Sequence, residues 1–241
     1  ERLASSKVAP IRRLANVLDA LWRRFVSGWK WKRRLASCGR GRQCGSKVMS
    51  TTINLTIGSS ANDDCGSAAF GLLNSTIDIT GKISGSFSVR AFFRFASATI
   101  PQGATIVSAA FSAVAVDTDS SSTWATLIHA NAADNPSAPA SGAALGALAL
   151  TTAFCTPTSS LNTTSGVRYN FDVASVVQEI VNRSGWASGN ALVIVWVDNG
   201  SSSGVNRRWS DYSSGSSNQA KLDIEYNDPV TAKPAYYYAQ Q

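Results

Sequence analysis

Apolar and polar residues alternate with a period of two along most of the chain after residue 51. In the segment 87–95, FSVRAFFRF, every second residue from Phe87 to Phe95 is apolar. Successive side chains of a β-strand point to opposite faces, so this pattern predicts strands with one buried face. Comparable segments lie at 51–57, 76–83, 106–116, 123–130, 147–154, 167–171, 191–197, 205–212 and 220–226, separated by turns rich in Gly, Ser, Asn and Asp. About ten strands arranged in this way are typical of an antiparallel sandwich or barrel.

Two segments of this region have other patterns. Residues 191–197, ALVIVWV, are apolar at every position, which predicts a central strand covered on both faces. Residues 173–183 place valines and Ile180 at helical spacing, with Asp172 as the expected N-cap and Gly185 after the end. We therefore expect one short helix over an end of the sandwich. The Pro/Ala/Ser-rich segment 131–146 is expected to be an exposed linker.

The first 48 residues do not share the strand pattern. Pro10 suits a first helical turn, and apolar residues follow it at helical spacing, at Ile11, Leu14, Leu18, Leu21, Trp22, Phe25 and Trp29. Basic residues lie between them, so the pattern predicts a basic amphipathic helix of about 20 residues. The chain is thus divided into a basic arm (1–48), a β-sandwich (49–227) and a Tyr-rich tail (228–241).

Charge separates the arm from the rest of the chain. The arm holds 13 of the 22 Lys and Arg residues and only two acidic residues, a net charge of +11, whereas residues 49–241 carry −4. An arm of this kind contacts nucleic acid or an anionic membrane, and the side chains expected to do so are Arg12, Arg13, Arg23, Arg24, Arg33 and Arg34. Two alternatives stay open. The helix packs on its own or a neighbouring subunit, or the natural chain begins at Met49, the only Met, and the arm is not native.

Composition restricts the possible functions. The chain has one His, three Glu and 15% charged residues, which argues against a helical bundle and against an enzyme built on several His or Glu side chains. No apolar run reaches the length of a membrane-spanning helix. We expect an all-β module without catalytic activity.

Four blocks of the chain resemble a known domain family. The blocks are RAFFRF at 90–95, IPQGATIVSA at 100–109, FDVASVVQEI at 171–180 and KLDIEY at 221–226, with GWASGN at 185–190 following the third. In order and approximate spacing they resemble a DNRLRE-type β-sandwich domain as found in bacteriophage structural proteins, over about residues 51–227. The resemblance implies a jelly-roll-like module for attachment, carbohydrate binding or virion assembly. It says nothing about the arm or the tail.

The best candidate for a binding site follows the loop 199–204. Arg207, Trp209 and Asp211 share one face of the predicted strand 205–212, and Tyr212 lies on the other. An aromatic ring beside charged groups is a common arrangement for sugar recognition, so these four residues are the tentative glycan contacts. The alternative is that Trp209 points inward as a core residue.

Other chemically capable residues are fewer. His129 is the only His, and Glu179 lies on the predicted helix; we expect structural roles for both and no catalytic residue. Asp117 and Asp119 lie on one face at a strand end and form a weak candidate for structural calcium, with ordinary solvation as the alternative. No other cofactor and no other metal is expected.

Four cysteines leave the disulfide status open. Cys38 and Cys44 lie in the arm, and Cys65 and Cys155 lie in the body. Four cysteines allow three pairings. A bridge between Cys65 and Cys155 is one possibility, and thiols that form no disulfide are the default expectation.

These features favour a non-catalytic virion structural or attachment protein, phage-like, as a tail, fibre or capsid-decoration component. The partners expected are other virion proteins, further copies of this chain and a surface glycan. No signal peptide follows Glu1 or Met49, and virion proteins reach the exterior by lysis without one, so we expect a virion location. Two alternatives are a carbohydrate-binding module of a secreted bacterial protein and a capsid protein whose arm binds the genome.

Overall fold

The computed structural model describes residues 50–67, 71–72, 77–85, 87–121, 123–159 and 161–229. The predicted arm helix and its six candidate arginines lie outside these residues, as do Cys38, Cys44 and most of the tail.

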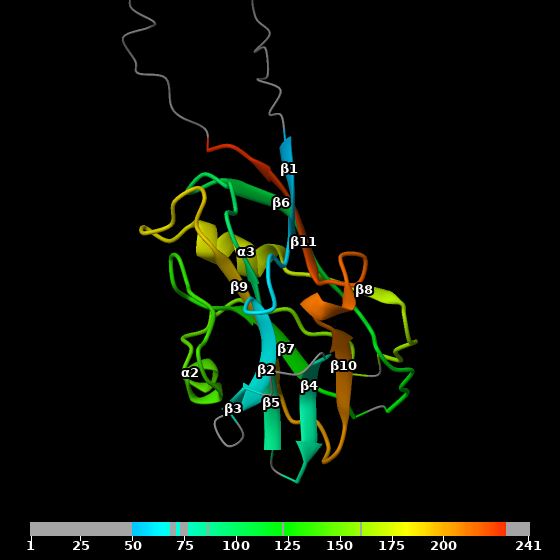
Figure 1. Cartoon of the computed structure of the whole chain (residues 1–241). Coiled ribbons are helices and arrows are strands. Elements are labelled where there is room, and N and C mark those ends of the chain that lie inside the picture. Colours follow the sequence, from blue (N-terminus) through cyan, green and yellow to red (C-terminus); the bar gives the residue numbers. More distant parts are fainter. Residues whose placement is uncertain are drawn as a thin grey trace, which may run out of the picture. The chain divides into compact units, whose positions relative to one another are not determined.

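Two antiparallel sheets form the molecule (Figure 1). The first has four strands in the order β1 (Ser50–Thr56), β11 (Lys221–Asn227), β6 (Thr105–Val114) and β8 (Arg168–Asp172). The second has seven strands: β10 (Asn206–Ser210), β4 (Ile77–Ser84), β5 (Phe87–Phe95), β2 (Asp63–Ser67) and β3 (Gly71–Leu72), with β9 (Leu192–Asp198) pairing β5 and β7 (Thr126–Ala130) pairing β9. The predicted all-β antiparallel sandwich is confirmed.

The main core lies between the two sheets and is rich in aromatic rings. Alternate residues of β5, including Ala91, Phe93 and Phe95, point into it and are almost fully buried. Phe111 of β6 meets Phe93 at 5.0 Å between ring centroids, and Phe171 of β8 packs beside it. Large rings bury much apolar area each, so this contact accounts for much of the stability of the sandwich.

A second, smaller core lies on the outer face of β9. Val193 and Val195 point into it, whereas Ile194 and Trp196 point into the main core, so β9 is covered on both faces as predicted. The short helix α2 (Gly142–Gly146) contributes the buried Leu145 to this outer core. The segment 131–146 was expected to be an exposed linker. Part of it instead covers Val193 and Val195, because these outer valines need an apolar partner.

The predicted helix is present as α3 (Ala174–Val181), and its valines and Ile180 lie in the main core. Its N-cap is Val173 rather than Asp172, although Asp172 Oδ1 accepts a hydrogen bond from the Ala174 amide at 3.0 Å. The prediction of a single helix was incomplete, since α2 and the 3-10 turn η2 (Tyr212–Ser214) also form.

Three further differences concern strands. Residues 147–154 form no strand; Leu150 and Cys155 make only isolated bridges. β3 was not predicted because it is two residues long. β2, DDCGS, was not predicted because its buried positions hold aspartates and a cysteine, so the alternation of apolar and polar residues is absent.

The first and last strands lie side by side. β1 pairs with β11 from Ser50 opposite Asn227 to Thr56 opposite Lys221. The positions where the arm and the tail join the sandwich are therefore neighbours at one end of a sheet. The hairpin between β4 and β5 and the loop between β9 and β10 lie at the opposite end (Figure 1).

Candidate functional site

Of the four predicted glycan residues, the two within β10 share one face, but that face is the inner one. Arg207 and Trp209 are 1% and 0% exposed. The Trp209 ring stacks on Trp196 with centroids 4.9 Å apart, and its Nε1 donates to Thr80 Oγ1 at 2.9 Å. With no exposed ring face, Trp209 cannot stack on a sugar in this conformation, so the geometry favours the core alternative.

Arg207 connects two loops to β10. Its guanidinium donates to the carbonyl oxygens of Ser121 at 2.7 Å and Leu161 at 3.0 Å, and it lies 3.2 Å from Asp119 Oδ1. It also lies over the Trp124 ring, 5.5 Å from the centroid. Buried arginines need such partners, and here they hold the loops in place.

Asp211 and Tyr212 lie where β10 ends. Asp211 is buried, and its Oδ1 accepts hydrogen bonds from the Ser213 and Ser214 hydroxyls at 2.8 and 3.2 Å. Tyr212 is half-buried and packs against the main core. Outside them is an open hollow of about 460 Å³ with a polar rim that includes Ser165, Ser213 and Asn218. The hollow is lined by their neighbours Ser210, Ser213 and Ser214, but by none of the four predicted residues.

The two candidate calcium ligands each face an arginine. Asp117 forms a two-point ion pair with Arg208, in which Nη2 donates to Oδ1 at 2.8 Å and Nε donates to Oδ2. These hydrogen bonds lower the pKa of Asp117. Asp119 faces Arg207 and accepts a hydrogen bond from the Ser121 amide at 2.7 Å. A calcium ion would have to displace both arginines, so the geometry does not favour this site.

His129 and Glu179 make contacts of a structural kind. His129 Nδ1 lies 2.9 Å from the Thr151 carbonyl oxygen, and its ring contacts Phe154. Glu179 of α3 accepts hydrogen bonds from the amides of Thr152 at 2.9 Å and Ala153 at 2.7 Å, and from the Thr152 hydroxyl. Both side chains hold the segment after α2 against its neighbours.

Cys65 and Cys155 are not joined by a disulfide. Cys65 is buried and Cys155 half-buried. Burial raises the pKa of the Cys155 thiol, and the negative charge of Asp172 adds to this effect. The low reactivity expected of such a thiol fits a packing role.

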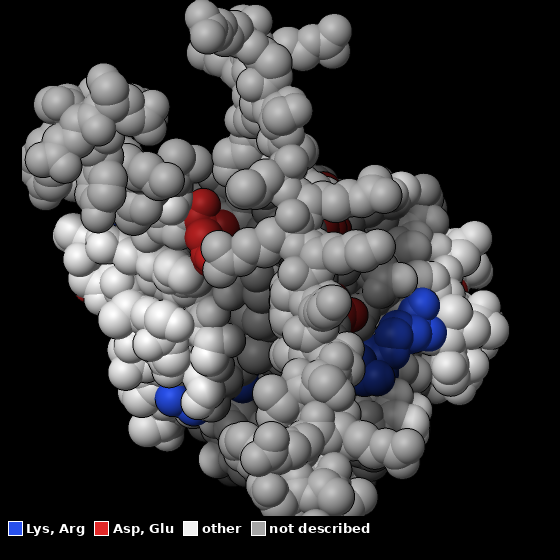
Figure 2. All heavy atoms as spheres, turned by 90° about the horizontal axis from the view of Figure 1, so that it is seen from above, with Lys and Arg blue, Asp and Glu red and all other residues white. Residues whose placement is uncertain are grey.

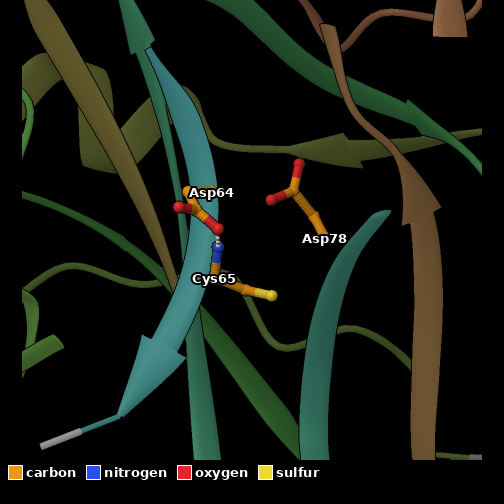
Figure 3. Close-up of side chains that lie close together, drawn as sticks. All are labelled: Asp64, Cys65 and Asp78. Atoms are coloured by element: carbon orange, nitrogen blue, oxygen red, sulfur yellow. Dashed lines mark hydrogen bonds between the residues drawn. The ribbon is translucent and has the colours of Figure 1, made fainter. Parts of the chain in front are cut away.

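Sequence reasoning missed a buried group of acidic side chains formed by Asp63, Asp64, Asp78 and Asp211. These four residues are between 1% and 8% exposed to solvent. Asp64, Cys65 and Asp78 offer oxygen and sulfur atoms that all lie within 4.8 Å of one another (Figure 3). We call Asp63, Asp64, Cys65, Asp78 and Asp211 the acidic cluster. Its only signal in the sequence is the pair Asp63-Asp64 next to Cys65, because Asp78 and Asp211 come from distant segments.

Burial perturbs the acidic cluster. Desolvation, reinforced by the charges of Asp211 and Asp64, raises the pKa of Asp63 to about 7, although the nearby Tyr212 amide opposes the shift. Desolvation and the charge of Asp63 raise the pKa of Asp78 well above its ordinary value. Carboxyl groups this close cannot all ionise without a compensating positive charge.

The outer surface of the sandwich carries few charges on the face that Figure 2 shows. Lys, Arg, Asp and Glu appear there as small separate groups among other described residues, without a broad basic patch. This agrees with the net charge of −4 over residues 49–241. None of the helices in the described part of the chain is long and apolar enough to cross a membrane.

Comparison with known proteins gave no assignment. No protein-family model matches the chain, and no curated protein matches it.

Proposed function

We propose that this chain is a non-catalytic structural or attachment protein of a virion. The resemblance of the blocks at 90–95, 100–109, 171–180 and 221–226 to bacteriophage structural domains is the first support. The second is that His129 and Glu179, two side chains considered for catalysis from the sequence, hold the framework together through hydrogen bonds.

The observation that carries the proposal is that the first and last strand residues lie at one end of the sandwich and two connected loops lie at the other. The pairing of Ser50 with Asn227 places the first and last strand residues side by side at one end. The turn at Gly85 and the loop 199–204 lie at the other end, where the Gly85 amide donates to Ser203 Oγ at 2.7 Å. A rigid body whose chain enters and leaves at one end, with connected loops at the other, suits a protein that is anchored at one end and makes contact at the other.

We also propose that any glycan contact is made at the end of the sandwich that carries the loop 199–204. Loop 199–204 follows the doubly covered strand β9, which holds its start rigidly, and Ser202 and Ser203 are exposed. Hydroxyl groups there and around the hollow beside Asp211 replace the buried Trp209 as the contacts to test.

A second candidate is a capsid protein whose arm binds the packaged genome. The separation of +11 in the arm from −4 in the remainder favours it, since concentrated charge on a segment outside a neutral body is typical of polyanion binding. Both candidates place the chain in a virion.

The test is the protein composition of particles. Particles released by lysis from the natural source are separated on a density gradient and analysed by mass spectrometry. We expect peptides from residues 50–227 in the particle fraction at a fixed ratio to the other particle proteins. A chain found only among soluble proteins would contradict the proposal. Peptides from residues 1–48 in the same particles would show that the arm is native.

A further inference from the structure

The acidic cluster lies where the seven-stranded sheet splits. β5 pairs with β4 through Val89 and with β2 from Arg90 to Phe93, so its pairing with β4 ends where its pairing with β2 begins, and β4 and β2 are not paired with each other. Cys65 of β2 and Asp78 of β4 direct their side chains into the space between the two strands, and Asp64 Oδ1 accepts a hydrogen bond from the Cys65 amide at 2.7 Å (Figure 3). A split in a sheet removes the hydrogen bonds that would otherwise join the two strands there.

Two members of the acidic cluster have oxygen atoms that are unsatisfied. Asp78 is 1% exposed, and its Oδ2 has no hydrogen-bond partner among the described residues. Asp63 is 3% exposed, and its carboxyl oxygens accept no hydrogen bond of ordinary geometry in the described ranges, although the Tyr212 amide lies close enough to lower its pKa. Buried carboxyl oxygens are costly unless they are paired or bind a cation. Asp78 points toward Asp64 and Cys65 (Figure 3), so its unsatisfied oxygen lies where a cation would be shared.

We propose that Asp64, Cys65 and Asp78 bind a divalent transition-metal cation of the zinc type. Their oxygen and sulfur donors lie within 4.8 Å of one another, a separation compatible with one shared ion. Zinc accepts carboxylate oxygen and cysteine sulfur as ligands, usually in a four-coordinate site, and a water molecule or Asp63 would complete the set.

The cysteine decides which class of cation is expected. Calcium and magnesium take oxygen ligands, and calcium needs six to eight of them, whereas thiolate ligands select zinc and related metals. Cys65 Sγ lies 3.6 Å from the Ile77 carbonyl oxygen and can donate its proton there. When the metal binds, the S–H bond of Cys65 and the O–H bond of any protonated carboxyl ligand break, sulfur and oxygen form bonds to the metal with the same electron pairs, and the protons leave to solvent.

The surrounding charges favour a cation. Asp63 and Asp211 lie near enough to the other carboxyl groups to interact with them electrostatically. A divalent ion would offset their mutual repulsion and would join β2 to β4, which do not pair with each other. The site is thus a structural one, and metal binding should raise the melting temperature by mass action.

The first experiment uses the full chain without a His tag, with Cys38 and Cys44 both replaced by Ser so that only Cys65 and Cys155 can supply a thiolate. After treatment with a chelator, the protein is titrated with Zn²⁺ by calorimetry and with Co²⁺ by absorption spectroscopy. We expect one equivalent of Zn²⁺ to bind, release of a proton, and a thiolate-to-cobalt charge-transfer band. Absence of that band, or stabilisation by Ca²⁺ but not by Zn²⁺, would overturn the proposal.

Matched variants identify the ligands. Asp78→Asn and Cys65→Ser should each weaken Zn²⁺ binding at least about tenfold, as loss of a ligand costs no less than loss of a supporting contact. Asp223→Asn, at an exposed position of β11, and Cys155→Ser should bind as the parent does. Equal affinity in all four variants would contradict the assignment, and so would loss of the cobalt band in Cys155→Ser. If a ligand variant fails to fold, the cobalt spectrum of the parent still decides whether a thiolate binds the metal.

Discussion

Trp209 shows how far a single residue can be interpreted from sequence. The alternation of strand residues placed Arg207, Trp209 and Asp211 on one face; in the structure Arg207 and Trp209 are both buried strand residues, whereas Asp211 lies beyond the end of β10. The sequence pattern could not distinguish the inner face from the outer one, because Arg207 and Asp211 are charged residues, a class that is rarely buried. The burial of Arg207 depends on carbonyl oxygens from distant loops, which no local pattern reveals. Asp211 is bound by the Ser213 and Ser214 hydroxyls of the turn that follows it.

A truncation at Trp209 tests its role. Trp209→Ala should lower the free energy of unfolding by about 3–5 kcal/mol, because it leaves a cavity beside Trp196 and removes the hydrogen bond to Thr80. Thermal and denaturant unfolding measure the loss. Phe87→Ala, at a side chain 40% exposed, is the control and should change stability by much less. A Trp209→Ala protein as stable as the parent would place the ring at the surface and restore it as a glycan contact.

At the scale of elements, strands with an apolar face could be predicted and strands without one could not. β5, β6, β9 and β11 were all expected close to their observed bounds, since their buried positions are apolar. β2 was not predicted because Asp63 and Cys65 occupy its buried positions. The five residues of α2 are too few to show helical spacing. The site within β2 was missed for the same reason as the strand.

The contact between α3 and the segment after α2 gives a pH-dependent prediction. Partial burial raises the pKa of Glu179. Hydrogen bonds from the Ala153 and Thr152 amides lower it by more than burial raises it, so the net shift is downward. A lowered pKa in the folded state means that the carboxylate stabilises the fold above its unfolded pKa. This contribution is lost as the pH falls through the folded pKa.

The variant Glu179→Gln measures this contribution. It should unfold about 1 kcal/mol more easily than the parent at pH 7, in line with one charged hydrogen bond that is partly exposed to solvent. The difference should shrink as the pH falls below the ordinary pKa of a glutamate and through the lowered pKa of Glu179 in the folded state, where the carboxylate becomes protonated. Chemical denaturation at several pH values follows it. A difference that is constant across this range would mean that the charge of Glu179 does not contribute.

At the scale of the whole molecule, the sheets are complete within residues 50–227. A protein of residues 49–227 should therefore fold alone, with a circular dichroism spectrum dominated by β-structure and a cooperative thermal transition. A spectrum dominated by helix, or no cooperative transition, would contradict this division of the chain.

The separation of charge gives a prediction for the arm. The full chain should bind duplex nucleic acid with an affinity that falls at least about tenfold between roughly 50 and 200 mM salt. Replacing Arg12, Arg13, Arg23, Arg24, Arg33 and Arg34 together by Gln should remove most of this binding, and residues 49–227 alone should show little. Filter binding or fluorescence anisotropy measures it. Binding to anionic vesicles but not to nucleic acid would assign the arm to a membrane surface instead.

The central claim, that the chain is a structural part of a virion, is tested most directly by labelling intact particles. Particles from the natural source are incubated with an antibody raised against residues 50–227 and then with gold-labelled secondary antibody, and examined by electron microscopy. The account predicts gold at regularly repeated positions on particles, with none on particles treated with pre-immune serum. Unlabelled particles, together with the chain detected only in the soluble fraction, would contradict it.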